Sequence, residues 1–134
     1  PANIEVARFV GSPQMNLLEG TLDGTGSHFH CGQLQLDLST MLGNPLARFA
    51  GRSLTIGMRA EDLQVVSPEQ GWIRGEVDIM EDLGSDRYLH IQSSGIEVVA
   101  RTGRETAPER GQLVGLNIEP RQMHFFHGGS RIEP

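Results

Sequence analysis

The chain has 134 residues, of which 37% are hydrophobic and 21% charged, so it can bury one core of ordinary size and is globular rather than disordered. Its formal net charge is −6, and all 11 basic residues are arginines. The lack of lysine excludes an ordinary P-loop and Schiff-base chemistry, and the acidic balance argues against binding a nucleic-acid backbone. No apolar run approaches the roughly 18 residues of a membrane span, and no signal peptide is visible.

Turn residues recur along the whole chain, beginning with the Gly-Ser-Pro turn at residues 11–13. The apolar runs between these turns are short, which is typical of an all-β fold, a small barrel or a sandwich. The segment 33–38 alternates strictly and predicts a strand with Leu34, Leu36 and Leu38 on one face.

One short helix is predicted at residues 44–51. Asn44 suits the N-cap, Pro45 the first helical position and Gly51 the position just past the end. The next segment, 53–58, alternates again and predicts a second strand with its leucine, isoleucine and methionine on one face.

The second half of the chain continues the strand pattern. Segment 75–80 predicts a strand with Val77 and Ile79 facing inward. Residues 87–101 predict a hairpin that turns at Ser93-Ser94-Gly95.

The remainder of the second half contains one polar stretch and one more strand. Residues 102–111 are polar and predict an exposed loop. Segment 112–118 predicts a late strand with Val114, Leu116 and Ile118 inward. Nothing indicates a linker, so we expect one domain over residues 1–134.

The segment His28-Phe29-His30-Cys31 contains residue types that bind zinc or copper. In a strand, however, His28 and His30 share one face while Cys31 points to the other. No second Cys/His pair stands at ligand spacing, so we expect a half-exposed strand with Cys31 in the core and no metal site. Cys31 is the only cysteine, which rules out an internal disulfide.

Five carboxylates gather in one acidic stretch, which could serve acid–base chemistry, bind calcium or contact a protein. They are Glu76, Asp78, Glu81, Asp82 and Asp86. Their spacing does not match an EF-hand loop, and strand alternation explains the first two as a solvated face. There is also no G-x-S-x-G elbow and no complete dinucleotide fingerprint, so we assign no catalytic residue.

Two further segments are candidates for structural or contact roles. Arg59 stands near Glu61 and Asp62 after a predicted strand, where an Arg–carboxylate pair could hold a tight turn. His124-Phe125-Phe126 precedes a Gly-Gly turn, and its aromatic rings could fill the core or form a contact surface.

Four segments together resemble the C-terminal regulatory domain of the carbohydrate-type import ATPases, the maltose-importer ATPase group of ABC transporters. GSPQMN resembles the family's G-S-P-x-M-N joint, and IGMRAEDL resembles I-G-x-R-P-E-x-L. VDIMEDLG resembles V-x-x-V-E-x-L-G, and HFFHGGSRI resembles H-x-F-D-x-x-T-G-x-x-I. The match runs from Pro1 to Ile132. Ala60 replaces the usual proline, and His127 replaces the usual aspartate.

The resemblance implies a small OB-fold-like β-barrel of the TOBE type with one or two short helical turns. It implies a regulatory and dimerisation domain without a cofactor of its own, since ATP and magnesium would be bound by an upstream nucleotide-binding domain that this chain does not include. Implied partners are a second copy, that nucleotide-binding domain, the membrane subunits and a cytosolic regulatory protein. The implied location is the cytoplasm, at the inner face of the membrane.

The residues that we expect to be structural or to lie in an interface combine the motifs with the candidates above. They are Gly11, Ser12, Pro13, Met15, Asn16, Arg59, Glu61, Asp62, Glu81, Gly84, His124, Phe125 and Phe126.

Two other functions remain open. A small-oxyanion domain of the molybdate type shares this barrel class, and SPQMNLLEG is loosely like its S-A-R-N-x-L-x-G. Gln14 or Met15 replaces that arginine, and the negative net charge is unfavourable for anions. A freestanding OB-fold nucleic-acid binder would need a basic groove with stacking aromatic residues, so we expect no nucleic acid as a partner.

Overall fold

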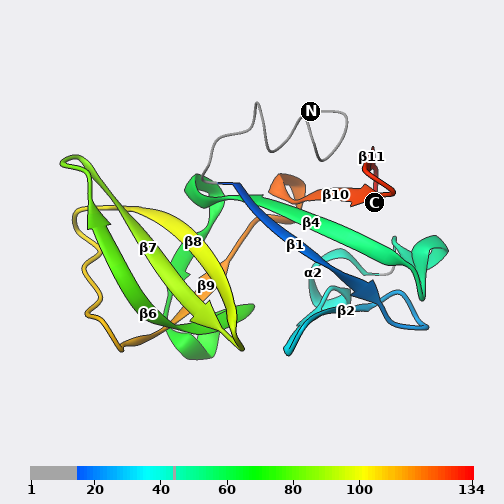
Figure 1. Cartoon of the computed structure of the whole chain (residues 1–134), viewed down its shortest axis with the longest axis horizontal. Helices are drawn as coiled ribbons and strands as arrows, with labels where there is room; N and C mark the ends of the chain where they lie inside the picture. Colours follow the sequence, from blue (N-terminus) through cyan, green and yellow to red (C-terminus); the bar gives the residue numbers. More distant parts are fainter. Residues whose placement is uncertain (1–14, 44) are drawn as a thin grey trace.

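The computed structural model describes residues 15–43 and 45–134, and it consists of two antiparallel sheets (Figure 1). The first sheet has six strands in the order β11-β10-β4-β1-β2-β3. Their bounds are β1 (Met15–Leu22), β2 (His28–Cys31), β3 (Leu34–Asp37), β4 (Ser53–Arg59), β10 (His124–His127) and β11 (Ser130–Ile132). The all-β prediction is therefore confirmed.

The second sheet has five strands in the order β5-β9-β6-β7-β8. Their bounds are β5 (Gln64–Val66), β6 (Ile73–Asp82), β7 (Asp86–Ser93), β8 (Ile96–Gly103) and β9 (Leu113–Asn117). Its two edge strands, β5 and β8, also contact each other, so this sheet curls toward a closed barrel. In Figure 1 its strands β6, β7 and β8 lie at the left, and β1, β4 and β10 of the first sheet lie at the right.

Helical structure in the described residues is limited to five short pieces, more than the one or two turns expected. They are the α-helix α2 (Ser39–Leu42) and the 3₁₀ turns η1 (Ala47–Phe49), η2 (Ala60–Asp62), η3 (Pro68–Gln70) and η4 (Pro120–Gln122). None of the helices in the described parts is long and apolar enough to span a membrane.

The helix predicted at residues 44–51 is wrong in its extent. Only η1 forms there, and Pro45 precedes it rather than opening it. Gly51 does follow the last helical turn and has the positive φ of 73° that favours glycine. Asn44 lies outside the described residues.

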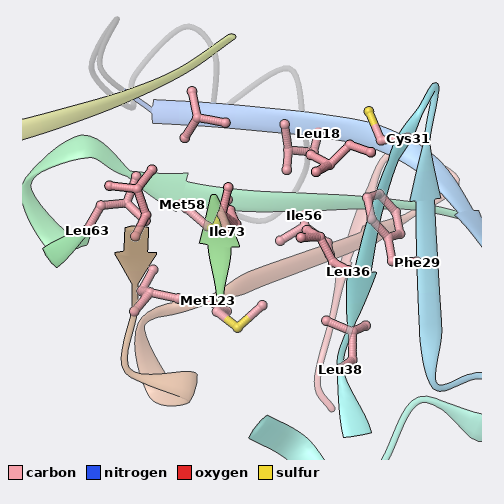
Figure 2. Packing of buried hydrophobic residues seen from close by; sticks show 14 of the residues in the cluster. Leu18, Phe29, Cys31, Leu36, Leu38, Ile56, Met58, Leu63, Ile73 and Met123 are labelled. Carbon is pink, nitrogen blue, oxygen red and sulfur yellow. The ribbon is translucent and has the colours of Figure 1, made fainter. Parts of the chain in front are cut away.

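Strand alternation buries one side of each sheet in a common core (Figure 2). Leu18, Phe29, Ile56 and Met58 enter this core from the first sheet, and Ile73 enters it from the second. Each is at most 3% exposed. The inward faces predicted for segments 33–38, 53–58 and 112–118 are confirmed, because the side chains expected to face inward all belong to this cluster: Leu34, Leu36, Leu38, Leu54, Ile56, Met58, Val114, Leu116 and Ile118. The two sheets are therefore held together mainly by the hydrophobic effect.

The hairpin predicted at residues 87–101 is confirmed, with a tighter turn than expected. Ser93 is the last residue of β7, and only Ser94 and Gly95 form the loop. Both have positive φ, 50° and 83°, as the type I′ turn of a two-residue hairpin requires.

The prediction that Ile79 faces inward is wrong. The pairing of β6 with β7 shifts between Val77 and Ile79, which is a β-bulge. An extra residue in one strand reverses the faces of all that follow, so Val77 is 1% exposed whereas Ile79 is 52% exposed.

Candidate functional site

Most of the candidate residues lie in two places. One is the junction between the two sheets, at β1, the end of β4, η2 and β10, and the other is the projecting hairpin of β6 and β7. Gly11, Ser12 and Pro13 lie outside the described residues. Met15 opens β1 and pairs with Arg59 at the end of β4. Asn16, the next residue, is one of the few buried polar residues, at 9% exposed.

The side chain of Asn16 bridges the two sheets. Its Nδ2 donates to the carbonyl of Met58 at 3.1 Å and to the carbonyl of Val99 at 2.9 Å. The backbone N–H of Val99 donates to its Oδ1 at 2.7 Å. Val99 lies in β8, an edge strand of the second sheet. The carboxamide thus forms the same pair of hydrogen bonds with Val99 that the backbone of a neighbouring strand would form. It satisfies the N–H and C=O of Val99, which have no strand partner on this side of β8.

The turn after β4 is held differently from the prediction. Within the described chain, Arg59 forms no ion pair with Glu61 or Asp62, so the predicted Arg–carboxylate lock is wrong. Instead, Nε2 of Gln122 donates to Oδ1 of Asp62 at 3.1 Å, which links η4 to η2. Ala60, at the position of the usual proline, is fully buried. Burial and a side-chain hydrogen bond from elsewhere in the chain therefore replace the local pair.

The aromatic residues of β10 are both buried, at 1% exposed each. Phe125 belongs to the core, whereas Phe126 points to the opposite face of the strand and packs beside Gly57. A Cβ atom on Gly57 would lie 3.3 Å from the Phe126 ring. Phe125 and Phe126 thus fill space inside the protein and do not form an exposed contact surface.

His124 is half-buried at the start of β10. Burial lowers the pKa of His124, and the positive charges of Arg131 and Arg59 lower it further, against a smaller opposite effect of Asp62. The imidazole is therefore neutral at pH 7 and does not add a cation to this end of the first sheet.

The acidic stretch is placed mostly on the hairpin of β6 and β7. The carboxylate of Asp82 accepts hydrogen bonds from Gly84 N at 2.9 Å and from Nη1 of Arg104 at 2.6 Å. The Gly84 hydrogen bond lowers the pKa of Asp82, and the charges of Arg104 and Arg87 lower it further. Gly84 has a φ of 94°, which the turn between the strands requires.

Other carboxylates of this stretch are arranged separately. Asp86 is paired with Arg101, whose Nη2 lies 2.5 Å from Oδ2. Glu76 and Asp78 line a hollow of about 290 Å³ at the bulge, together with Gln92 and Arg110. Glu81 contacts His90 on the next strand. The structure thus spreads the acidic residues over turns and ion pairs rather than around one centre.

No group of three or more His, Cys, Asp or Glu residues in the described chain is arranged to hold a metal ion. Cys31 is buried and His28 is exposed on the opposite face of β2, as the alternation predicts. His28 lies between two carboxylates, 3.4 Å from Asp23 and 3.8 Å from Asp37.

A set of exposed apolar side chains lies on the hairpin of β6 and β7 and on the adjacent strand β9. Large apolar side chains that are 43% to 61% exposed are Ile79, Met80, Leu83 and Leu113. Three of them lie in or directly after β6 beyond the bulge, and Leu113 lies on the adjacent β9. The exposure of Leu113 follows from the alternation that places Val114 inward, whereas the exposure of Ile79 depends on the bulge, which alternation cannot reveal.

Comparisons with known proteins identify the family. The sequence model of the TOBE domain matches residues 56–126, which is just over half of the chain. The chain belongs to the TOBE domain family. A second model, the MalK OB fold domain, matches residues 11–63. The two matches overlap at the end of β4 and η2, so the resemblance to the maltose-importer ATPase group is confirmed on both sides of the sheet junction.

Two relatives of this TOBE domain are sn-glycerol-3-phosphate import ATP-binding proteins UgpC. The protein of Escherichia coli O6:K15:H31 (strain 536 / UPEC) is 33% identical over 134 residues, and that of Pectobacterium atrosepticum is 34% identical over 135 residues. The matches cover 98% and 99% of this chain but only 37% of each relative. The chain thus spans well under half the length of these proteins.

Among solved structures, the cytoplasmic molybdate-binding protein ModG in its molybdate-bound form superposes with a TM-score of 0.65. The sequences are 13% identical, and the match covers 87% of this chain and 99% of the other. At this identity the likeness shows a shared fold.

Proposed function

We propose that this TOBE domain is the regulatory and dimerisation domain of an ATP-binding subunit in an ABC importer for sugars or related solutes such as glycerol phosphate. The observation that carries the proposal is the pair of matches to the MalK OB fold and TOBE domains within one chain. The UgpC relatives, similar over nearly the whole chain, support the same class of importer.

In this proposal the chain performs no chemistry itself. ATP and magnesium are bound by a nucleotide-binding domain outside these residues, and the membrane subunits are contacted through the whole protein. A second copy and a cytosolic regulatory protein are the proposed direct partners. The protein then acts in the cytoplasm at the inner face of the membrane. The projecting hairpin, with its exposed apolar side chains, supports a role in contacts.

The experiment that tests this proposal is a domain exchange in UgpC of Escherichia coli. The matching 37% of UgpC is replaced by this chain, and uptake of sn-glycerol-3-phosphate is measured in cells that lack the native subunit. We expect uptake above that of a truncated UgpC without any replacement. A chimera that is abundant and hydrolyses ATP but gives no uptake beyond the truncated protein would overturn the proposal.

A second measurement addresses dimerisation. Sedimentation of the isolated chain over a wide concentration range is expected to show a monomer–dimer equilibrium. A strict monomer at high concentration contradicts a dimer contact carried by this domain alone.

The oxyanion alternative is tested separately by thermal shift with molybdate, tungstate and sulfate. We expect no change in Tm, because the chain has no lysine and a net charge of −6. A rise in Tm with molybdate but not with sulfate would favour the alternative.

A further inference from the structure

Three strands of the second sheet are joined by one histidine. His90 lies in β7, with β6 on one side and the edge strand β8 on the other. Its Nε2 contacts Oε1 of Glu81 from β6, and its Nδ1 lies 3.0 Å from Oε1 of Glu97 from β8. The His90 side chain is 21% exposed, whereas the two carboxylates are about half exposed. Both ring nitrogens are thus engaged, each by a carboxylate of a different neighbouring strand.

This arrangement suits only one protonation state of the ring. An imidazolium donates from both nitrogens, so it satisfies both carboxylates at once. A neutral imidazole has one N–H and one lone pair, and the lone pair would then face a carboxylate oxygen. The two hydrogen bonds can therefore coexist only while His90 carries both protons.

No other charged group near this face can replace the positive charge of His90 between the two carboxylates. Glu76 of β6 and Tyr88 of β7 are the remaining titratable groups of the two strands on this face. Arg101 of β8 is engaged by Asp86, and its other charged neighbour is Glu61 of η2. No described cation other than the histidine itself stands between Glu81 and Glu97.

We propose that Glu81, His90 and Glu97 form a proton-operated clamp across β6, β7 and β8. The clamp is closed when the His90 imidazole is doubly protonated and opens when it loses one proton. Ile79 pairs directly with His90, so the clamp lies beside an exposed apolar side chain of the hairpin. The inference goes beyond the proposed transport role and does not depend on it.

The direction of the titration follows from the contacts. Partial burial alone would lower the pKa of His90, but the hydrogen bonds with Glu81 and Glu97 and their negative charges outweigh it, so the pKa is raised above 6.5. A raised pKa in the folded state means that the clamp contributes fully below pH 6.5 and is lost as the pH rises through the folded value. The clamp therefore opens at a higher pH than that at which an ordinary histidine loses its proton.

The test compares His90→Gln with a matched control, His30→Gln, in the full chain. His30 is also a partly exposed strand histidine, but no carboxylate contacts it in the described structure. Thermal unfolding is measured from pH 6 to pH 9. We expect the Tm of the wild type to exceed that of His90→Gln by several degrees at pH 6, with this difference vanishing by pH 9, whereas the difference for His30→Gln stays constant.

A second readout separates the clamp from a simple packing effect. The Cε1–H resonance of His90 is titrated by NMR in the wild type and in Glu97→Gln. We expect the midpoint to lie above 6.5 in the wild type and to fall in Glu97→Gln. A Tm difference for His90→Gln that does not change with pH, or a midpoint unaffected by Glu97→Gln, would overturn the proposal.

Discussion

The carboxamide of Asn16 pairs with both backbone polar groups of Val99, although 83 residues separate them in the chain. One side chain at the second position of β1 thereby completes the hydrogen bonding of an edge strand in the other sheet. Because Asn16 also donates to Met58 in β4, the same amide connects β1, β4 and β8. The Asn of the G-S-P-x-M-N motif thus has a physical role in joining the two sheets.

Asn16→Ala should therefore be among the most destabilising polar substitutions in this chain. It removes three hydrogen bonds and leaves the N–H and C=O of Val99 without these partners, so we expect a loss of about 2–4 kcal/mol in the free energy of unfolding. Urea denaturation measures this loss. The control is Gln35→Ala, which removes an exposed strand amide and should change stability by less than about 0.5 kcal/mol. Equal effects of both substitutions would contradict the role of Asn16.

The close approach of β1 to β2 gives a second prediction. A Cβ atom on Gly20 would lie 2.1 Å from the backbone oxygen of His30 and 2.7 Å from the Phe29 ring. Gly20→Ala must therefore push the strands apart, which we expect to cost about 2–3 kcal/mol or to prevent folding.

The matched control for Gly20→Ala is Gly24→Ala. Nothing lies within 4 Å of a Cβ atom at Gly24, and its φ is not positive. The free energy of unfolding of Gly24→Ala should stay within about 1 kcal/mol of that of the wild type. Tm values of the two variants measure the difference, and a Gly20→Ala protein as stable as Gly24→Ala would show that β1 and β2 are not packed as described.

Local sequence patterns predicted much of the fold because they report on which face of a strand is apolar. Strict alternation placed the leucines of segment 33–38 in the core, and the Ser94-Gly95 pair marked the hairpin. The hairpin register even implies that Glu97 lies near His90, since Gln92 pairs with Glu97 and His90 with Val99. The predictions that were wrong concerned features that depend on contacts between residues far apart in the sequence.

The errors share a cause that lies outside any short window of sequence. The bulge after Val77 follows from pairing with β7 and β9, and it turned Ile79 outward and placed Glu81 beside His90. Arg59 was expected to hold the turn because it is near in sequence, yet the hydrogen bond to Asp62 comes from Gln122, 60 residues away. Tertiary contacts thus decided the points that local patterns left undetermined.

A substitution in the tight turn between β7 and β8 should increase the stability of the protein. Ser94 is the one described non-glycine residue with positive φ, at 50°, and asparagine tolerates this conformation better than serine. Ser94→Asn would create the Asn-Gly pair favoured in type I′ turns. We expect it to stabilise the protein by about 0.5 kcal/mol, as a rise in the urea midpoint with an unchanged m-value. A destabilised Ser94→Asn would mean that the turn is not of type I′.

The loop between β1 and β2 should make the stability of the protein depend on pH in the acidic range, through Asp23. The carboxylate of Asp23 accepts hydrogen bonds from the Thr25 hydroxyl at 2.8 Å and from the backbone N–H groups of Thr25, Ser27 and His28. The Thr25 hydroxyl, together with these N–H groups, lowers the pKa of Asp23 from 3.8 to about 2, although partial burial opposes the shift.

A carboxyl whose pKa is depressed in the folded state stabilises the fold above its unfolded value, and this contribution is lost as the pH falls through the folded value. We therefore expect Asp23 to stabilise the loop above about pH 3.8 and to lose this effect between there and about pH 2. Asp23→Asn should lower the Tm at pH 5 but bring it close to that of the wild type at pH 2. The control is Asp78→Asn, at an aspartate of β6 with no hydrogen bond in the described structure, whose Tm difference should not follow this course. Parallel Tm curves for the wild type and Asp23→Asn between pH 5 and pH 2 would contradict the assignment.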